Sequence, residues 1–473
     1  MSATSAGPAG ATGSGPAEPS GDLSAYGYTQ ELKRGLSLRN LVVYGMVFMV
    51  PIAPFSIFGG VFDASRGMVP LTYLIGFVAM IFTAVSYQQM SRAFPVAGSV
   101  YAYAGRGIAP PVGFLAGWAI LLDYLLVPTL LYVIGANAMA SVVPVVPQQV
   151  WIVAFVLLNT VVNLRGVETT ARANLVFLAA QLLVLAVFVV LAVVAIQRGV
   201  NGAEWTTLPF YNPAEFSTPL VFTALSVAVL SFLGFDAIST MSEETTGGNR
   251  VVGRATILAL CVVAFLFVLQ TYLASLLHPG MTAFPDADAS NNAFYDIGRM
   301  IAGPWLQVVI ALAVAIGAAV ANSLVAQAAT SRLLFSMSRD RQLPAFLRHI
   351  DPVRRVPQRA ILLVAGISLV LGLFFVGQIN LLASLCNFGA LSAFLLLHVS
   401  VVSHYLLRRR QKTYGVHLVV PVLGFAIIGY VLWNADVHAK VGGLVWLAIG
   451  CGVLLLLRRM GRSVSFEATD SLG

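Results

Sequence analysis

Twelve apolar runs divide the chain, and each is about as long as a segment that crosses a lipid bilayer. A membrane-spanning helix needs about 20 apolar residues, because the hydrocarbon core is about 30 Å thick. Of the 473 residues 58% are hydrophobic and only 10% are charged, whereas soluble domains are roughly 25% charged. We therefore predict an all-α integral membrane protein with twelve transmembrane helices. The predicted spans lie near residues 41–62, 69–90, 112–140, 150–163, 173–196, 219–241, 255–277, 303–331, 360–377, 380–405, 416–433 and 441–457.

The basic residues predict how these spans are oriented. If the amino terminus is cytoplasmic, 23 of the 27 Lys and Arg residues fall on the cytoplasmic side, and only Arg66, Arg198, Arg299 and Lys440 fall outside. Short cytoplasmic loops of membrane proteins carry such an excess. Both termini are therefore expected in the cytoplasm, and the net charge of +8 indicates topology rather than a nucleic-acid partner.

The first apolar run is interrupted halfway, between Val50 and Gly60. Pro51 and Pro54 cannot donate backbone hydrogen bonds, and two glycines follow them. Backbone groups without helical partners are costly in hydrocarbon and are tolerated where they line an enclosed cavity, although a plain proline kink is the alternative. The interruption predicts substrate contacts from Ala53, Phe55, Ser56, Ile57 and Gly59.

A second interruption falls in the sixth apolar run, from Ser231 to Asp236 with Gly234 at its centre. Interrupted helices at corresponding positions of two halves point to the binding site of a secondary transporter. We therefore assign Ser231, Phe232, Gly234 and Asp236 to the substrate site. Tyr124 and Phe232 are the expected aromatic walls, because a cation can lie over an aromatic face.

Few ionisable residues fall inside the predicted spans, where a charge costs about 2.5–3.5 kcal/mol. Asp123 is expected roughly 18 Å into the third span, near the bilayer midplane. It is the candidate for proton coupling, and a structural carboxylate is the alternative for it and for Asp236, which also resembles a helix cap. Glu243 and Glu244 are expected near the cytoplasmic surface, as gate salt bridges or as solvated charges. His398 and His404, six residues apart, are expected to pack in the helix bundle rather than to relay protons.

Three motifs resemble those of the amino acid-polyamine-organocation superfamily of permeases. They are Pro-x-x-Gly-Ser-x-Tyr-x-Tyr from Pro95 with Gly113-Phe-Leu-Ala-Gly-Trp118, the stretch from Ser231 to Thr245, and the stretch from Ser331 to Pro344. The resemblance extends from about Leu36 to Arg410. It implies a five-plus-five inverted repeat of the LeuT type with two peripheral helices.

This resemblance divides the chain into repeats and tails. Residues 36–200 would form the first repeat with spans one to five, and residues 201–410 the second repeat with spans six to ten. Residues 411–460 would hold the peripheral spans. Residues 1–35 and 461–473 are expected as cytoplasmic tails, the first of them disordered because it is rich in Gly, Ala, Ser and Pro and has no apolar core.

Within the superfamily the chain resembles bacterial putrescine importers at Leu122-Asp-Tyr124, Phe232-Leu-Gly-Phe-Asp236 and Asn387-Phe-Gly-Ala390. Two midplane carboxylates suit a diamine, because an unpaired ammonium is penalised out of water. Half-helix amides near Ser56 would equally suit the carboxylate of an amino acid. In several proton-coupled relatives a lysine of the fifth helix replaces the sodium ion, and the matching Gln181 carries no proton. A proton-coupled putrescine importer is therefore predicted, with a general amino acid permease or an exchanger as the alternative.

Other classes lack the sequence features that they require. There is no Walker loop, no dinucleotide fingerprint and no His-Glu-x-x-His motif, so we predict no enzyme, no cofactor and no metal site. Three scattered cysteines predict no disulfide framework. A solute-binding membrane sensor is the alternative from another class. The expected location is the bacterial inner membrane, with the substrate, protons and the lipid bilayer as partners.

Overall fold

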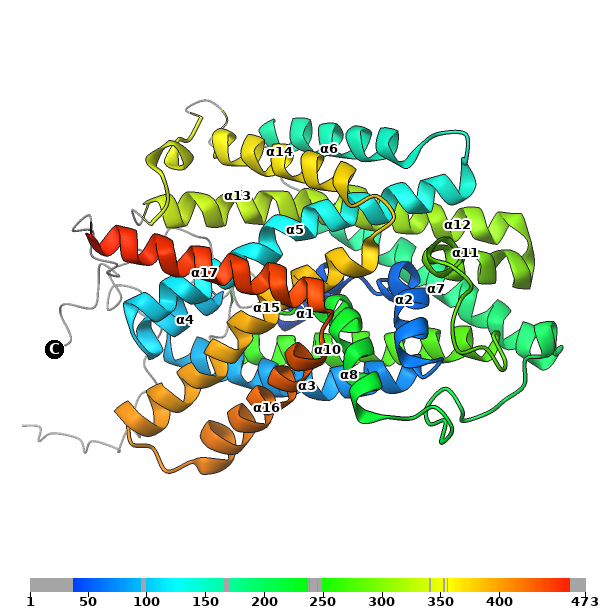
Figure 1. Cartoon of the computed structure of the whole chain (residues 1–473), viewed down its shortest axis with the longest axis horizontal. Coiled ribbons are helices and arrows are strands. Elements are labelled where there is room, and N and C mark those ends of the chain that lie inside the picture. The colour runs from blue at the N-terminus through cyan, green and yellow to red at the C-terminus, as the bar shows by residue number, and fades with distance from the viewer. Residues whose placement is uncertain are drawn as a thin grey trace, which may run out of the picture.

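The computed structural model describes residues 37–94, 99–165, 171–236, 238, 245, 249–339, 342–351, 354 and 356–459. Within these residues every segment of regular structure is a helix, and most helices run along the long axis of the molecule (Figure 1). The predicted tails, 1–35 and 461–473, lie outside the described residues, as do Glu243 and Glu244.

The first half of the chain forms seven α-helices and one short 3₁₀ helix among the described residues. They are α1 (Leu38–Met49), α2 (Pro54–Ser65), α3 (Val69–Ala93), α4 (Ser99–Gly107), α5 (Pro110–Val142), α6 (Gln148–Leu164), α7 (Ala171–Gln197) and the short η2 (Val200–Gly202).

The second half contains several helices that change type along their length. They are α8 (Thr218–Ala228), η3 (Val229–Phe232), α10 (Asn249–Leu276), α11 (Ala287–Ala302), α12 (Pro304–Val314), η5 (Ala315–Asn322), α13 (Ser323–Arg339), η6 (Ala345–Arg348), α14 (Gln358–Phe374), α15 (Ile379–Val401), η7 (Val402–Arg408), η8 (Gly415–Val419), α16 (Val420–Asn434) and α17 (Val437–Arg459). Of these, η5, η7 and η8 are π-helical.

Eight helical segments are long and apolar enough to cross a membrane, and α1 with α2 makes a ninth if this pair, bent by 57°, counts as one span. Three shorter apolar helices, Gln148–Leu164, Thr218–Phe232 and Gln358–Phe374, accompany them. The predicted all-helical membrane architecture is confirmed at this level, because eight or nine such segments in the described residues require a multi-pass membrane protein.

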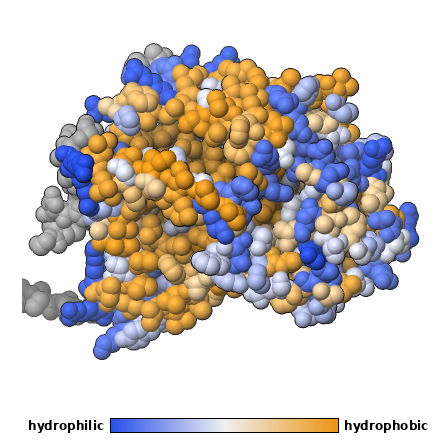
Figure 2. All heavy atoms as spheres, viewed as in Figure 1, coloured by the Kyte–Doolittle hydropathy of each residue, from blue (hydrophilic) through white to orange (hydrophobic). Residues whose placement is uncertain are grey.

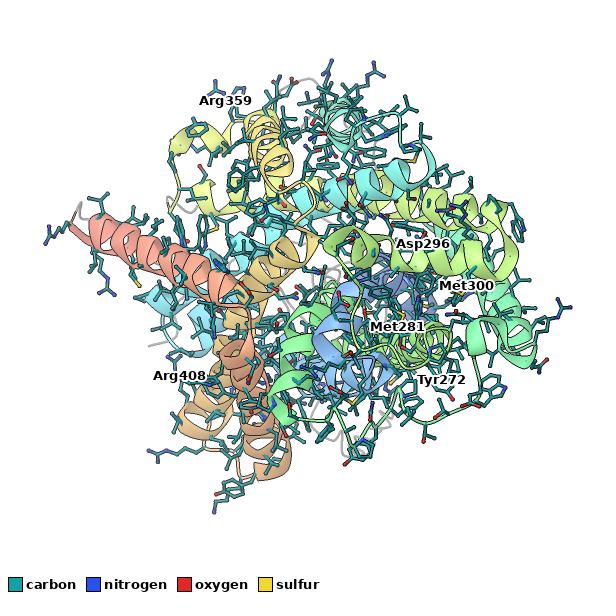
Figure 3. All side chains as sticks on the ribbon, turned by 45° about the vertical axis from the view of Figure 1, so that its right-hand side comes forward. Tyr272, Met281, Asp296, Met300, Arg359 and Arg408 are labelled. Carbon is teal, nitrogen blue, oxygen red and sulfur yellow. The ribbon has the colours of Figure 1, made fainter. Side chains whose placement is uncertain are left out.

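The outer surface agrees with this assignment. Large apolar side chains point outward from several helices, among them Leu157 on α6, Leu183 on α7, Phe265 on α10 and Leu455 on α17. Figure 2 shows apolar residues over much of the visible face and polar residues gathered toward its ends. Arg359 and Arg408 lie toward one end of the bundle, and Asp296 and Met300 lie toward the other (Figure 3).

The 33-residue α5 is the central scaffold of the bundle. It packs against α4, α6, α13, α14, α15 and α17, while α10 packs along α3 and α1 on the other side of the molecule. Small residues permit the closest approach, because a Cβ at Gly389 of α15 would lie 2.8 Å from the Asp123 amide nitrogen on α5. The position of α5 therefore brings Asp123 into the interior.

The last helix, α17, is fastened to α5 by two tryptophans. The indole rings of Trp118 and Trp446 stack with centroids 4.9 Å apart. Each ring nitrogen donates to the carbonyl of the other residue, at 2.8 Å from Trp118 and 2.7 Å from Trp446. Gly450 leaves room for this pair, because a Cβ there would lie 2.7 Å from Cγ and Nε1 of Trp118.

Gly450→Ala should therefore lower the thermal stability of the purified protein. Overpacking of a filled interface costs about 1–3 kcal/mol, and the added methyl group would displace the Trp118 ring. Gly452→Ala on the same helix is the matched control, because no atom lies within 4 Å of the added Cβ. Equal melting temperatures for the two variants in detergent would contradict this account of the contact.

Candidate functional site

The first break is shorter than the sequence predicts. α1 ends at Met49, Val50 adopts a positive φ of 50°, and α2 already begins at Pro54. Proline is favoured at the first helical position because its φ suits the helix and its missing amide is not needed there. The predicted break therefore has to be corrected: Phe55, Ser56, Ile57 and Gly59 belong to the first turns of α2, and among the predicted contacts only Ala53 lies in the break.

The amides at this break already have backbone partners. The Ala53 amide donates to the Val50 carbonyl at 2.8 Å, that of Phe55 to Ile52 at 3.0 Å, and that of Ser56 to Ala53 at 3.2 Å. These turn-type bonds replace the helical ones that the prolines remove. The interruption between Val50 and Gly60 was expected to leave backbone groups without helical partners, and this is wrong for the amides of Phe55 and Ser56.

A side chain that sequence reasoning missed completes the first break. Gln270 of α10 is fully buried, and its Nε2 donates to the Pro51 carbonyl and to the Leu266 carbonyl, both at 2.9 Å. Its Oε1 has no hydrogen-bond partner among the described residues. The signal in the sequence was a lone glutamine within the seventh apolar run, a costly placement that requires a polar partner.

The second break falls within the stretch that the sequence predicts. α8 ends at Ala228, η3 follows as one 3₁₀ turn, Leu233 is extended, and Gly234 has a φ of 107°. Nδ2 of Asn387 on α15 donates to the freed carbonyls of Ser226 at 2.7 Å and Val227 at 3.2 Å. Asn387, like Gln270, thus satisfies backbone groups that a helix break leaves open.

The two breaks touch each other in the interior. A Cβ at Gly234 would lie 3.2 Å from Cβ and 3.3 Å from the carbonyl carbon of Phe48, near the end of α1. Glycine is therefore required at 234 both by its positive φ and by this close approach. The contact joins segments nearly 190 residues apart in the sequence.

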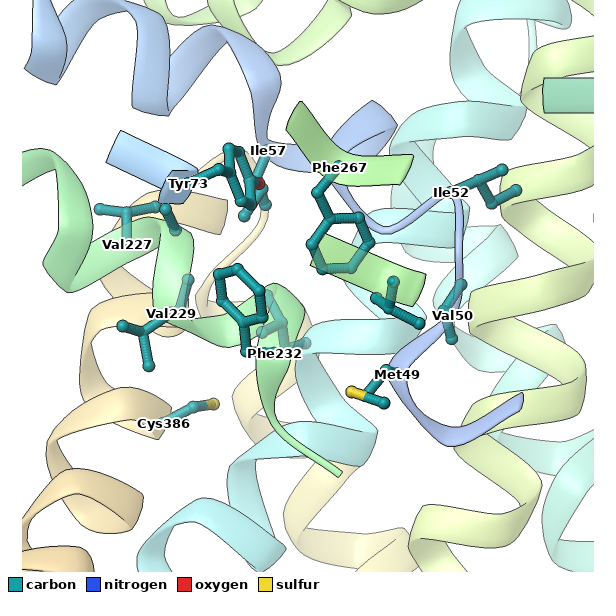
Figure 4. Close-up of a cluster of buried hydrophobic side chains, with 14 of the residues drawn as sticks. Met49, Val50, Ile52, Ile57, Tyr73, Val227, Val229, Phe232, Phe267 and Cys386 are labelled. Carbon is teal, nitrogen blue, oxygen red and sulfur yellow. The ribbon is translucent and has the colours of Figure 1, made fainter. Parts of the chain in front are cut away.

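Phe232 fills the space between the second break and its neighbours. Its ring is fully buried, with its centroid 5.8 Å from that of Tyr73 on α3 and 5.3 Å from that of Phe267 on α10 (Figure 4). The adjacent Ser231 hydroxyl shares a hydrogen bond of 2.9 Å with the Tyr73 hydroxyl. Ser231 and Phe232 therefore fix the break against α3 and α10.

Both predicted carboxylates are buried in the same region. Asp123 on α5 is 8% exposed and Asp236, just after the second break, is 7% exposed. They lie close enough to interact electrostatically, and both also act on the hydroxyl of Tyr124. Oδ1 of Asp123 has no hydrogen-bond donor among the described residues. Two acidic groups in one low-dielectric region create a strong preference for a cation.

Other predicted contacts belong to helix packing. The Phe55 ring stacks on Phe294 of α11 at 3.9 Å between centroids and meets Phe188 of α7 edge-on at 5.6 Å. Gly59 packs so closely on α11 that a Cβ would collide with the Ser290 carbonyl. These two residues therefore hold α2 against α7 and α11.

The remaining polar residues singled out from the sequence lie in packed positions. His398 is 1% exposed and hydrogen-bonds through Nδ1 to Ser86 at 2.9 Å and through Nε2 to Thr83 at 3.3 Å. The His404 ring packs edge-on against Phe94 at 4.8 Å. Gln181 on α7 is 5% exposed and faces Gly317 of the π-helical η5, with its Oε1 lacking a partner among the described residues.

Comparisons with known proteins identify the family and several relatives of the chain. Residues 40–455 match the amino acid permease family. The chain is 35% identical over 426 residues to the low-affinity putrescine importer PlaP of Escherichia coli strain K12, covering 89% of this chain and 92% of the importer. It is 26% identical to the branched-chain amino acid permease BcaP of Bacillus subtilis, over 92% of this chain and 96% of that protein. It is also 26% identical to the methylthioribose transporter of Bacillus subtilis, over 93% and 97%. These relatives are transporters, not enzymes.

Gly234→Ala should destabilise the protein by forcing a side chain into the contact between the breaks. A non-glycine residue at such a φ costs about 1–3 kcal/mol, and the Phe48 backbone would have to move as well. Gly366→Ala on α14, where a Cβ meets nothing within 4 Å, is the control. Thermal unfolding of both purified variants checks this, and a Gly234→Ala protein as stable as the control would contradict it.

Proposed function

Because the chain belongs to the amino acid permease family, we propose that it is a secondary active transporter that imports putrescine or a similar small diamine together with protons. The family and the named relatives support the coarser statement, transport of an amine or amino acid by a multi-pass membrane protein.

The buried pair Asp123 and Asp236 is the observation that carries the choice of a diamine. An ammonium group leaves water at a high cost unless a charged partner receives it, and a diamine has two such groups and no carboxylate. The Tyr124 hydroxyl is within electrostatic range of both carboxylates. The similarity to a putrescine importer along 89% of the chain supports the same choice.

The proposed architecture has twelve spans in two inverted repeats. The eight long segments, the bent pair α1–α2 and the three shorter apolar helices together account for all twelve. Both touching breaks then lie in the first span of their repeat, as in transporters built from inverted repeats. Residues 36–200 and 201–410 form the repeats, and 411–460 form the peripheral spans. The excess of Arg and Lys puts both termini in the cytoplasm of a bacterial cell.

Asp123 is the proposed proton carrier. It is buried on the central helix, its Oδ1 lacks a donor among the described residues, and it lies within the electrostatic reach of Asp236. A carboxylate in this position binds either a proton or an ammonium group of the substrate. Because each displaces the other, proton transfer and substrate transport are coupled. Gln181, which holds no proton, has no part in this step.

An amino acid remains the second candidate substrate, because the branched-chain permease of Bacillus subtilis is 26% identical over nearly the whole chain. The carboxylate of the amino acid would bind at the amino terminus of α2, near Ser56 to Gly59, where the helix dipole favours an anion. The backbone bonds of Phe55 and Ser56 would have to open for this contact. A membrane sensor for the same solutes would bind them without accumulation.

Asp123→Asn should abolish concentrative uptake of labelled putrescine into proteoliposomes driven by an imposed pH gradient, because the amide cannot cycle a proton. Exchange of internal for external putrescine should persist. Asp288→Asn, an exposed position on α11, is the control. Full accumulation by Asp123→Asn, with an unaltered dependence on pH, would rule out the proposed carrier.

The substrate is decided by competition for uptake. Putrescine in excess should suppress the uptake of labelled putrescine by the unmutated protein. Asp236→Asn should lower the affinity for putrescine at least tenfold, since a charge-assisted contact contributes roughly 1.5–3 kcal/mol. If only neutral or cationic amino acids compete in the unmutated protein, the amino acid permease assignment replaces the diamine assignment. Binding without accumulation would select the sensor.

A further inference from the structure

A cavity with both polar and apolar lining residues lies away from the two carboxylates at the breaks. It has a volume of about 400 Å³, is partly open, and is bordered by α2, α8, α15 and the start of α17. On α8 its wall ends at Val227, two residues before the turn that opens the second break. The cavity is thus next to the candidate site and separate from it.

Two carboxylates line this cavity from different elements. Asp63 is on α2, and Asp436 immediately precedes α17. Oδ1 of Asp63 accepts the Phe284 amide at 2.7 Å, and Oδ1 of Asp436 accepts the His438 amide at 2.8 Å. No hydrogen bond to Oδ2 of either residue is formed by the described part of the chain. Each carboxylate therefore keeps one oxygen for a ligand.

The nearby basic residues are engaged elsewhere. Nη1 of Arg66 lies 2.6 Å from Oε2 of Glu215, and Nζ of Lys440 donates to the Trp433 carbonyl at 2.9 Å. Neither Arg nor Lys is among the lining residues. The basic residue that does line the cavity is His438, whose Nδ1 lies 3.3 Å from Oδ1 of Asp436. Two carboxylates face this single imidazole, so the cavity has a net negative potential.

A hydroxyl that faces the cavity makes no hydrogen bond to the protein. Ser384 on α15 is 3% exposed as a residue, it lines the cavity, and its side chain makes no hydrogen bond within the described residues. A hydroxyl that is open to the cavity and has no protein partner is available to a ligand or to water. Its apolar neighbours Ala64, Val227 and Leu381 offer a surface for a short methylene chain.

We propose that this cavity is an outer binding site for a primary diamine, which places one ammonium group on Asp63 and the other on Asp436, with Ser384 as a further acceptor. The proposal rests on the diamine transport proposed above. Asp63 and Asp436 then capture the cation at the end of the bundle that also holds α11, before it reaches Asp123 and Asp236.

The test measures putrescine binding to full-length protein in lipid nanodiscs, in the Asp123→Asn background that weakens the inner site. Residual binding of labelled putrescine is expected there. Asp63→Asn with Asp436→Asn should raise its dissociation constant about tenfold, since each partly exposed charge pair contributes up to roughly 1 kcal/mol. Asparagine keeps the oxygen that accepts both amides, so the fold is preserved, and melting temperatures verify this.

Asp286→Asn is the matched control. Asp286 is also an exposed helix cap, accepting the Ala289 amide at 2.8 Å, yet it does not line the cavity, so the dissociation constant should not change. Ser384→Ala should raise it about threefold, as for the loss of one neutral hydrogen bond.

Two results separate the outer site from transport itself. If the unmutated protein accumulates putrescine, and the paired Asp63→Asn and Asp436→Asn substitutions change neither the KM of uptake nor the dissociation constant in the Asp123→Asn background, the outer site is overturned and the proposed function stands. If the unmutated protein neither accumulates nor binds putrescine, the proposed function fails and the outer site fails with it.

Discussion

The structure depends on one constraint, that a backbone group inside hydrocarbon must find its hydrogen-bond partner within the protein. The chain meets it with helices nearly everywhere and departs from them at two points in the interior. At both points a buried amide side chain compensates, with Gln270 donating to the carbonyl of Pro51 and Asn387 to those of Ser226 and Val227. The breaks are stable because side chains of other helices donate the hydrogen bonds that the interrupted helices no longer form.

The same constraint explains where acidic groups are tolerated. Asp123 and Asp236 are both buried inside the helix bundle, away from lipid, and both interact electrostatically with Tyr124. Asp63 and Asp436 line a cavity farther along α2 and α8. A cation moving between these pairs would pass along interrupted helices whose polar atoms replace part of its hydration shell.

Packing decides how far such a site can move. Gly234 of the second break lies against Phe48 on α1, and Gly389 on α15 lies against the backbone of Asp123 on α5, so at both contacts the two segments approach with almost no side chain between them. Phe232 is fixed between Tyr73 and Phe267. A transporter has to alter some of these contacts in each cycle, and the small residues let helices slide where bulky side chains would interlock.

The sequence by itself determined the membrane class, the helices and both breaks, because apolar length and proline or glycine placement are local properties that hydrocarbon enforces. It also selected Asp123 and Asp236, since a buried charge is costly wherever it occurs. The sequence predicted a first break that is too long, because Pro54 is a helix-breaking residue by its local pattern. In the structure Pro54 is the first residue of α2. Only the tertiary structure decided that Phe55 and Gly59 pack against α11, that Gln270 and Asn387 complete the breaks, and that Asp63 and Asp436 share a cavity. These contacts join residues more than 150 positions apart, and side chains so distant in sequence meet only through helix packing.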